Sequence, residues 1–388
     1  METVNFKTKT IFTNRSDKQL KGVWPVAIDI GYSGVKIFSP NKVAVFPSYA
    51  KPYVDKGTIG KLPDDFIVYK DLDTNESWLV GNMAQTDSNT NEAIDSDEAN
   101  FGRQRYFDPM FKVIARTGLG ISMIPNKYAE MGSRKLIVQT GLPPKFISDN
   151  VHLRKVLSGH HHFSVKIGSN NPVEFDFELN DDDINIILQP MGTLYSAAIN
   201  NDHKFTNQAT EYLSKNVLIF DAGFGTLDFF LVKNHTIKNS ETFSNLSMKQ
   251  VFMETTEAIQ KKYGGDKISV SDMQKYLKTG LVRTYDVMTF STKDEPFGDL
   301  LEEASNKVCK RAIDKMAQTY PLQELDYLIV TGGTGAAWER NIKNTFKNMT
   351  TLNIVSGNQN ETNLPFIFAN VRGYYMYLYS TLEMKEMR

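Results

Sequence analysis

Short apolar runs alternate with stretches of helical periodicity along most of the chain. Apolar runs bounded by turn residues indicate buried strands, whereas apolar positions three and four apart indicate helices. Strands are expected at Val26–Ile30, Val35–Phe38, Phe66–Tyr69, Trp78–Val80, Lys135–Thr140, Ile184–Leu188, Val217–Phe220, Leu227–Val232 and Tyr327–Val330. Helices are expected at Phe107–Ala115, from Thr193 to Ile199, at Ser247–Tyr263, at Phe297–Thr319 and, amphipathic, at Val371–Met387.

The alternation of strands and helices predicts an α/β architecture. A chain of 388 residues is long enough for two or three domains. Residues 1–23 show no clear periodicity, which favours an extension or an edge element. The acidic stretch Thr86–Asn100 is expected to form an exposed loop.

Composition narrows the class of protein. Hydrophobic residues make up 41 % of the chain, enough for ordinary packed cores, and the net charge of −1 gives no overall basic field for nucleic acid. The net charge does not exclude a local basic patch. The one cysteine, Cys309, rules out an internal disulfide framework and fits a reducing cytoplasm. No apolar run approaches the ~20 residues that span a bilayer, and no signal-peptide pattern begins the chain. We therefore expect a cytoplasmic protein without a membrane partner.

An internal repeat is the most informative feature of the sequence. The segment VAIDIGYSGVKIF, which starts at Val26, aligns with LIFDAGFGTLDFF, which starts at Leu218. The alignment places Asp29 on Asp221 and Gly31 on Gly223. Each segment runs from an apolar strand through Asp-X-Gly and a tight turn into a second apolar strand, so one hairpin is used twice.

Such a hairpin suits phosphate and a metal ion. Glycine lets the backbone come close to a ligand, and successive N–H groups form an anion-binding concavity. The aspartates, Asp29 and Asp221, make sense if each faces Mg²⁺, directly or through water. The alternative is an ordinary hairpin with a turn aspartate, which is the better interpretation of either copy alone; two matched copies favour binding. The candidate phosphate-binding residues are Gly31, Tyr32, Ser33, Gly34 and Lys36 in the first copy and Gly223, Phe224, Gly225 and Thr226 in the second.

A third glycine-rich element follows the strand at Tyr327–Val330. Gly332, Gly333 and Gly335 would let a base and ribose lie against the backbone, and the following helix would offer N–H groups to phosphate. The candidate nucleotide-binding residues here are Gly332, Gly333 and Thr334. The turn is neither a Walker A loop nor a GxGxxG fingerprint. By itself the turn is weak evidence for binding, because packing alone explains most turns of this kind.

These three elements, in this order, resemble the superfamily of actin, Hsp70 and sugar kinases. Asp29–Lys36 and Asp221–Asp228 look like its two phosphate loops, and Thr331–Gly335 looks like its adenosine motif. Gln189–Ala197 is similar to the first connecting helix, and Pro365–Tyr374, with Gly373, to the second connection. The chain length and the general pattern of the sequence are most like those of the bacterial plasmid-segregation proteins of ParM and Alp type. Two departures are Phe224, where the second loop often has glycine, and the long segment before Val26.

The resemblance implies a two-domain actin-like fold, a duplicated ribonuclease H-like arrangement with ATP in the interdomain cleft. Domain I would cover residues 1–215 with a small insert at about 46–114. Domain II would cover residues 216–388 with an insert at about 244–324, and its last helix, 371–388, would return to domain I.

The resemblance also implies an activity: hydrolysis of ATP, with GTP left open, coupled to assembly into dynamic filaments. Asp29 and Asp221 would hold Mg²⁺, Asp221 would also serve catalysis, and Gln189 would orient the attacking water. A helix-capping role for Gln189 is the alternative. The partners would be further copies of the chain and an adaptor that binds DNA, so that plasmid DNA is contacted only indirectly. A small-molecule kinase of the same fold and a non-polymerising ATP-binding scaffold remain alternatives.

Three other patterns have plainer interpretations. His160-His161-His162 cannot all face one ion in regular structure, which favours a solvated loop or strand end over a metal site. Lys249, Lys261 and Lys262 are typical of a solvated helix face. The aromatic residues Tyr374, Tyr375, Tyr377 and Tyr379 favour core or domain packing over a stacking platform for nucleic acid.

Overall fold

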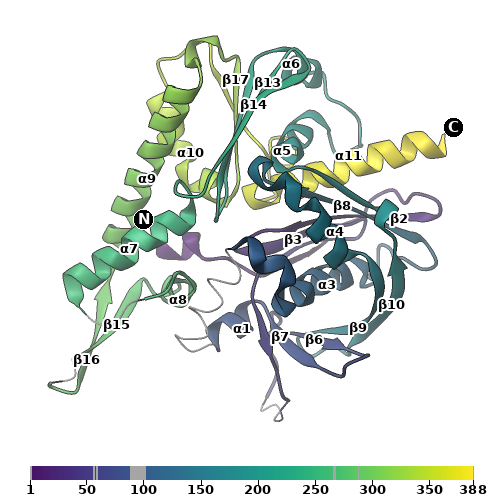
Figure 1. Ribbon diagram of the computed structural model, residues 1–388, viewed down its shortest axis with the longest axis horizontal. Helices are drawn as coiled ribbons and strands as arrows, with labels where there is room; N and C mark the ends of the chain where they lie inside the picture. The colour runs from purple at the N-terminus through teal and green to yellow at the C-terminus, as the bar shows by residue number, and fades with distance from the viewer. Residues whose placement is uncertain are drawn as a thin grey trace.

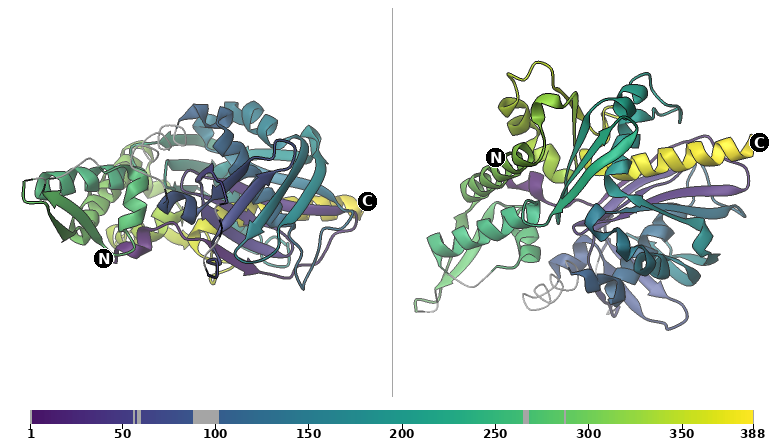
Figure 2. Two further views of the ribbon diagram at one scale, coloured as in Figure 1. Left: turned by 90° about the horizontal axis from the view of Figure 1, so that it is seen from below. Right: turned by 45° about the horizontal axis from the view of Figure 1, so that its top comes forward.

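The structure is a computed structural model that describes residues 2–55, 57, 60–87, 102–264, 268–286 and 288–387. Most of the acidic stretch predicted as a loop at 86–100 lies outside the described residues. Two α/β halves flank a pair of crossing helices, α5 and α11 (Figure 1). Figure 2 shows the same two halves from below and with the top of the molecule brought forward.

The first half is built on a six-stranded sheet in the order β1-β4-β3-β2-β8-β11. β2, β3 and β4 form an antiparallel meander, and β8 and β11 continue the sheet in parallel. Alternate residues of β2 enter different cores: Val26 and Ile28 pack on the side of α3, and Ala27 packs on the side of α11. Helices thus cover both faces, which explains the nearly continuous apolar run of β2. The strands are β1 Ile11–Asn14, β2 Val23–Ile30, β3 Gly34–Phe38, β4 Lys42–Pro47, β8 Lys135–Leu142 and β11 Ile184–Leu188, and the helix is α3 Pro109–Met123.

A second, five-stranded sheet in the order β10-β9-β6-β7-β5 belongs to the same half and shares its core. Its strands β5, β6 and β7 lie within the insert expected at 46–114, but β9 and β10 come from beyond residue 114. The insert expected from the sequence therefore contains three of the five strands of this sheet. The elements are β5 Ala50–Pro52, β6 Ile67–Asp71, β7 Ser77–Val80, β9 Gly159–Ile167, β10 Val173–Leu179, α1 Asn82–Thr86 and α4 Asn150–Leu157.

The second half carries a five-stranded sheet in the order β14-β13-β12-β17-β18. The helices α7, α9 and α10 pack on one face of it, and a two-stranded hairpin, β15–β16, extends beyond them (Figure 1). The predicted helices at 247–263 and 297–319 are α7 and α9. The elements are β12 Val217–Ala222, β13 Leu227–Lys233, β14 Thr236–Phe243, β15 Leu281–Asp286, β16 Ser291–Pro296, β17 Tyr327–Thr331, β18 Asn353–Ser356, α6 Ala209–Ser214, α7 Met248–Tyr263, α8 Val270–Tyr276, α9 Gly298–Thr319 and α10 Gly333–Thr345.

Two helices, α5 (Gln189–Ala198) and α11 (Ala369–Glu386), cross between the halves. They touch through glycines: a Cβ added to Gly373 would lie 1.7 Å from the carbonyl oxygen of Gly192. α11 also packs on β2, β3 and β8 of the first half. The prediction of an amphipathic C-terminal helix is wrong for its beginning, because every residue from Ala369 to Met376 is buried between neighbouring elements.

No helix among the described residues combines the length and the apolar character needed to cross a membrane.

Candidate nucleotide site

The internal repeat is a structural repeat. In the first hairpin Asp29 pairs with Lys36 across β2 and β3, and in the second Asp221 pairs with Asp228 across β12 and β13. The turns close in the same way: the Gly31 N–H donates to the Gly34 carbonyl at 3.2 Å, and the Gly223 N–H donates to the Thr226 carbonyl at 2.8 Å. Because the strand register and the hydrogen bond that closes the turn are the same in both, the two hairpins share one backbone structure.

The two turns meet across the space between the halves. A Cβ added to Gly225 would lie 2.2 Å from the Tyr32 ring, so only glycine allows this approach. Behind Tyr32, the guanidinium of Arg105 lies 4.7 Å from the ring centroid and donates to the Ile30 carbonyl at 2.8 Å. Phe224 does not narrow the second turn; its ring packs edge-on against Phe252, with centroids 5.6 Å apart.

Two adjoining cavities lie beside these turns. The larger, of about 330 Å³, falls within the usual range of ligand pockets, and the smaller has about 70 Å³. Six residues line both: Asp29, Ser33, Lys36, Gln189, Gly223 and Phe224. Of the other predicted residues, Gly34, Asp221, Gly332, Gly333 and Thr334 line the larger cavity, and Gly31, Tyr32, Gly225 and Thr226 line the smaller one. The fold therefore brings all the predicted site residues together.

In the first hairpin the strand-end carboxylate is paired. Lys36 Nζ lies 3.0 Å from Asp29 Oδ2, and its side chain folds across Gly31, where an added Cβ would come within 2.6 Å of Nζ. The Ser48 hydroxyl donates to the Gly31 carbonyl at 2.7 Å and fixes the turn from outside. An ammonium group thus stands at the mouth of a glycine turn, where it can meet a phosphate oxygen.

In the second hairpin no lysine faces the strand-end carboxylate. Asp221 is fully buried and accepts from Gln189 Nε2 at 3.1 Å and from Asn370 Nδ2 at 2.7 Å. Burial raises the pKa of Asp221, the charge of Asp29 raises it further, and these two amide donors oppose the rise. Burial, and then the charge of Asp221, raises the pKa of Asp228 to about 8. The charge of Lys36, on the other hairpin, also lowers the pKa of Asp221, and a bound cation would act in the same direction.

Gln189 is the first residue of α5, and its side chain turns toward the site instead of the helix. The helix is capped by Leu188, which contributes no side-chain hydrogen bond, and the amide of Gln189 donates to Asp221. The side chain of Gln189 thus lies at the site, and its role in orienting a water stays a prediction.

The third glycine element forms the opposite wall. Gly332 precedes α10 at φ +83°, and a Cβ there would lie 2.1 Å from the Ala222 carbonyl oxygen and 2.9 Å from Asp221 Oδ1. The Thr334 hydroxyl donates to the Gly223 carbonyl at 2.7 Å, which ties the start of α10 to the second hairpin. The N-terminus of a 13-residue helix therefore faces the cavity, an arrangement that suits phosphate or a ribose hydroxyl.

The donors present fit a hydrated Mg²⁺. No group of three or more His, Cys, Asp or Glu side chains in the described part of the chain could hold a metal by itself. Mg²⁺ does not need such a group, since it is usually bound by one or two carboxylates together with waters and phosphate oxygens. Asp29 and Asp221 both line the larger cavity, and a cation between them would relieve their repulsion.

Several site residues were missed by the sequence reasoning. Asn370 orients Asp221 and is itself held by Thr193, whose hydroxyl donates to Asn370 Oδ1 at 2.6 Å. Asn370 lies within the segment that resembles the second connection, so its position could have been singled out. Arg105 and the wall formed by residues 5–11 had no such signal, because neither lies in a periodic or glycine-rich pattern.

Comparison with known proteins bears on the fold. Residues 27–192 match the family model described as the N-terminal domain of actin-like proteins. None of the curated protein sequences matches the chain. Fold and site together define an actin-like fold: two halves, each with a phosphate-type hairpin, around one cleft.

Solved structures of ParM proteins and of an archaeal actin homolog share this fold. A non-polymerisable quadruple mutant of pCBH ParM matches with a TM-score of 0.71 at 20 % identity, over 92 % of this chain and 99 % of that one. A 15-stranded ParM filament from Clostridium botulinum matches with a TM-score of 0.68 at 19 % identity, again over 92 % and 99 %. An archaeal actin homolog in complex with ADP matches with a TM-score of 0.57 at 14 % identity, over 92 % and 99 %. At these identities the likeness establishes the fold.

Proposed function

We propose that the chain binds and hydrolyses ATP with Mg²⁺ in the cleft between its halves and couples hydrolysis to assembly into filaments. One observation carries the proposal: two hairpins in the same register meet at their turns beside a cavity of about 330 Å³. Two matched anion-binding turns that face each other suit a polyphosphate held between two bodies. The ADP bound by an archaeal actin homolog of the same fold agrees with a nucleotide here.

Each side chain has a role in this mechanism. The turns Gly31–Gly34 and Gly223–Thr226 present backbone N–H groups to the phosphates, and Lys36 supplies a positive charge. Asp29 and Asp221 would hold Mg²⁺ with its water shell, and the ion would supply positive charge to the transferred phosphoryl group. Gln189, held near Asp221, orients the attacking water. Gly332, Gly333 and Thr334 form the wall for the adenosine.

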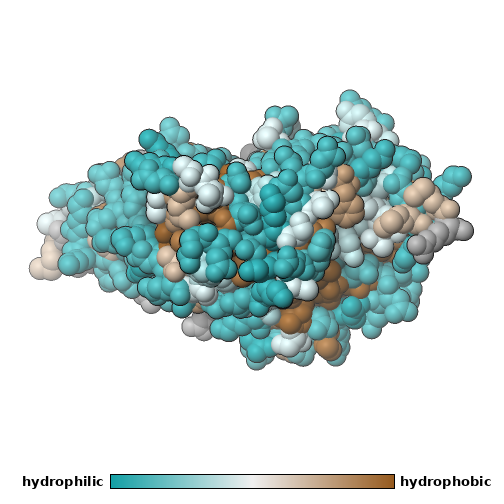
Figure 3. Space-filling view, turned by 90° about the horizontal axis from the view of Figure 1, so that it is seen from above, coloured by the Kyte–Doolittle hydropathy of each residue, from teal (hydrophilic) through white to brown (hydrophobic). Residues whose placement is uncertain are grey.

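Self-assembly is supported by the neighbours and by this chain's surface. One of the solved neighbours is a ParM filament and another is an Alp filament. In this chain the tip of the β15–β16 hairpin exposes two apolar side chains, Met288 at 86 % and Phe290 at 80 %. On the face shown in Figure 3 the surface is mainly hydrophilic, and hydrophobic colour also reaches the end at which this hairpin lies. We infer a cytoplasmic filament that separates plasmid DNA through an adaptor, with DNA contacted only indirectly.

Light scattering with ATP and Mg²⁺ tests the proposal. The purified chain should give a large rise that depends on both, and electron microscopy should show filaments. A small-molecule kinase of this fold would turn over ATP only with an acceptor and give no such rise. A non-polymerising scaffold would bind ATP with neither turnover nor scattering. Either result would contradict the proposal.

The Asp221→Asn variant tests the site within the same assay. The amide keeps the shape and can still accept from Gln189 and Asn370, but it removes the carboxylate that positions Mg²⁺. We expect phosphate release to fall at least about tenfold, equivalent to about 1.4 kcal/mol. Asp64→Asn, at a solvent-exposed position of the first half, is the control and should behave as the wild type. Wild-type turnover in Asp221→Asn would remove this residue from the site.

A further inference from the structure

The N-terminal segment connects the two halves a third time, in addition to the helices α5 and α11. We propose that residues 3–14 form a strap across the nucleotide cavity that limits how far the cleft opens and so sets the rate at which nucleotide leaves. The inference rests on the proposed function for the identity of the ligand. Its geometric part, the tether, stands on the contacts of the segment alone.

The beginning of the strap is anchored in the second half. The short 3₁₀ helix Thr3–Phe6 lies beside α7 and α8 in Figures 1 and 2. Phe6 is 8 % exposed and belongs to the core of the second half. The Thr3 hydroxyl donates to the Leu277 carbonyl at 2.8 Å, and the Thr8 N–H donates to Gln274 Oε1 at 3.0 Å. Three separate contacts therefore fix this end to the helix α8 and its surroundings.

The other end of the strap is anchored in the first half. β1 forms the edge of the six-stranded sheet, with Ile11 opposite Val45 and Asn14 opposite Lys42 on β4. Directly after β1, the Arg15 N–H donates to the Asn41 carbonyl at 2.9 Å. The strap thus enters the sheet as the strand β1 and cannot slide without breaking the backbone hydrogen bonds between β1 and β4.

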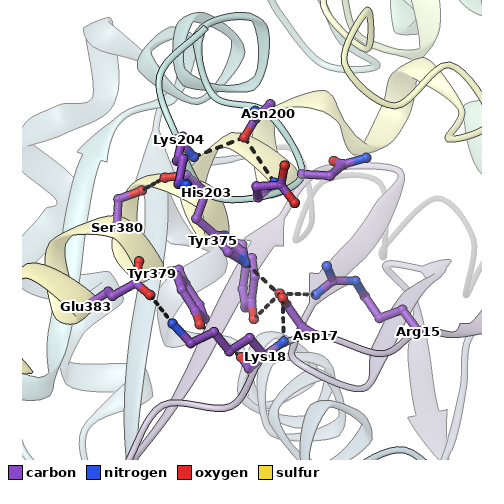
Figure 4. Close-up of polar contacts among 12 residues, drawn as sticks. Arg15, Asp17, Lys18, Asn200, His203, Lys204, Tyr375, Tyr379, Ser380 and Glu383 are labelled. Atoms are coloured by element: carbon purple, nitrogen blue, oxygen red, sulfur yellow. Dashed lines mark hydrogen bonds and ion pairs between the residues drawn. The ribbon is translucent and has the colours of Figure 1, made fainter.

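A buried polar cluster locks the chain just beyond β1 (Figure 4). Asp17 accepts from Arg15 at 3.0 Å and from the Tyr375 hydroxyl at 2.9 Å, and lies 2.8 Å from Nε2 of His203. The His203 ring stacks on Tyr379, with centroids 3.6 Å apart. Asp17, His203 and the α11 tyrosines come from three separate segments, so this cluster ties the root of the strap to the crossing helix.

Between the anchors the chain is short. Four residues lie between Phe6 and Ile11, so that five Cα–Cα steps join them and limit their distance to about 17 Å even when the chain is fully extended. Lys7 already has extended dihedrals, φ −75° and ψ 133°, and residues 8–10 form neither helix nor strand. An outward rotation that carried the two anchors further apart than this limit would have to break one of them.

The strap also forms part of the cavity wall. Five consecutive residues, Asn5 to Lys9, line the larger cavity together with Ile11. Thr8 touches the first phosphate-type turn, since a Cβ on Gly34 would lie 3.4 Å from its Cγ2. Lys7 and Lys9 add two ammonium groups to a wall that faces the turns. The strap therefore forms one wall of the cavity, and an opening of the cleft would move this wall away from the turns.

Lengthening the strap tests the proposal without removing an anchor. A Gly-Ser-Gly-Ser insertion between Lys9 and Thr10 leaves the contacts of Thr3, Phe6 and Thr8 and the β1–β4 ladder unchanged, while it adds up to about 14 Å of reach. The same insertion after Gly132, which sits at φ +56° in an exposed loop with open space around it, is the matched control.

Two readouts separate the tether from the ligand. The first is the release of a fluorescent ATP analogue chased with unlabelled ATP, which should be at least tenfold faster in the strap insertion than in the control. The second needs no nucleotide: spin labels at Val151→Cys on α4 and Lys310→Cys on α9, both exposed, report the distance between the halves. The strap insertion should broaden this distance distribution. The native Cys309 is buried, which raises the pKa of its thiol to about 12 and keeps it unlabelled.

The outcomes are distinct. Release and distance distribution both unchanged from the control would overturn the strap. A wild-type chain that binds no nucleotide would overturn the proposed function, and the distance measurement would then decide the tether alone. As a second variant, Phe6→Ser should reproduce the faster release by freeing the first anchor, whereas Val4→Ser, at an exposed position of the same segment, should not.

Discussion

At the scale of single residues, the two hairpins share a backbone but differ in charge. Asp29 faces Lys36, so its carboxylate is neutralised within the hairpin. Asp221 faces Asp228, and its oxygen is held by the neutral amides of Gln189 and Asn370. Neutral donors orient a carboxylate without cancelling its charge, so Asp221 stays available to a cation. The two aspartates that align in sequence are therefore expected to contribute unequally to metal binding.

The three adjacent histidines show how a strand assigns different environments to neighbours. They begin β9, so His160 and His162 point to one side and His161 to the other. His161 is buried, stacks on Phe177 with centroids 4.9 Å apart, and its Nε2 lies 2.8 Å from the Leu157 carbonyl oxygen. The prediction of a solvated strand end holds for His160 and His162 and is wrong for His161.

A prediction on acid stability follows from His161. Burial lowers its pKa from 6.5 to about 4, so on acidification the unfolded chain binds this proton before the folded one. The free energy of unfolding should therefore fall as the pH drops from about 6.5 to 4, by about 2–3 kcal/mol from this residue. His161→Gln should flatten this part of the profile in urea unfolding at several pH values.

His162 provides the contrast for that experiment. Its hydrogen bond with Asp73 raises the pKa of the exposed imidazole, so its contribution has the opposite sign: it is present at low pH and is lost as the pH rises through the folded pKa. His162→Gln should leave the acid-side loss intact. An unchanged acid-side slope in His161→Gln would show that the buried imidazole does not cause it.

At the scale of elements, the contact between α5 and α11 explains both of its glycines. Gly192 and Gly373 let the backbones of the two crossing helices touch, and Tyr374 closes over Gly192. The polar network Thr193–Asn370–Asp221 spans the same crossing and reaches the site. The position of Asp221 therefore depends on how closely these two helices pack.

Gly373→Ala should disrupt this crossing. The added methyl group would lie 1.7 Å from the Gly192 carbonyl oxygen, and backbone on both sides cannot move aside as a side chain could. Overpacking of this kind typically costs about 1–3 kcal/mol, and we expect a loss at the upper end, seen as a lower urea midpoint. Gly335→Ala in α10, where the nearest atom is a side-chain carbon at 3.3 Å, should change the midpoint little. Equal midpoints for both variants would show that the helices can separate at low cost.

At the scale of the whole molecule, nucleotide state can set the angle between the halves. The turns of both halves line the cavities, and Asp29 and Asp221 would share one metal, so contacts to the terminal phosphate favour closure. After hydrolysis those contacts are lost and the closed state loses its advantage. If the proposed function holds, we expect α5, α11 and the strap to restrict this motion to a hinge.

Gln189→Ala tests the link from hydrolysis to filament lifetime. The residue is expected to contact the attacking water and not the nucleotide, so ATP affinity should stay near wild type. Phosphate release should fall about tenfold or more, at least ~1.4 kcal/mol of transition-state stabilisation. Filaments should then assemble with ATP but persist, as measured by light scattering after ATP is exhausted in the wild type.

A glutamine at another helix start serves as the control. Gln208 precedes α6, is exposed, and makes no side-chain cap hydrogen bond, so Gln208→Ala should leave release and filament lifetime unchanged. Loss of assembly together with lower thermal stability in Gln189→Ala would point to a structural role. Unchanged phosphate release would exclude Gln189 as the residue that positions water.

The sequence by itself determined the repeat, and with it most of the site. Asp-X-Gly between apolar strands dictates a tight hairpin through local backbone preferences, so Asp29, Asp221 and the turn glycines could be identified from their neighbours in the chain. The strand before Gly332 and the helix after it could be predicted from the sequence for the same reason. The fold class followed from this local information, since strands and helices that alternate pack in few ways.

Only the tertiary structure decided which distant residues complete the site. Asn370 reaches Asp221 across 149 positions of sequence, and the strap reaches the cavity because its two ends are held by different halves. β9 and β10 join the second sheet from beyond the expected insert, since their partners are chosen by pairing and burial. His161 is buried because it lies on the inner side of β9. The first part of α11 is buried all round because elements of both halves pack against it. The periodicity of a segment indicates which of its faces is buried. It does not indicate which distant residues pack against that face, and these features depend on those residues.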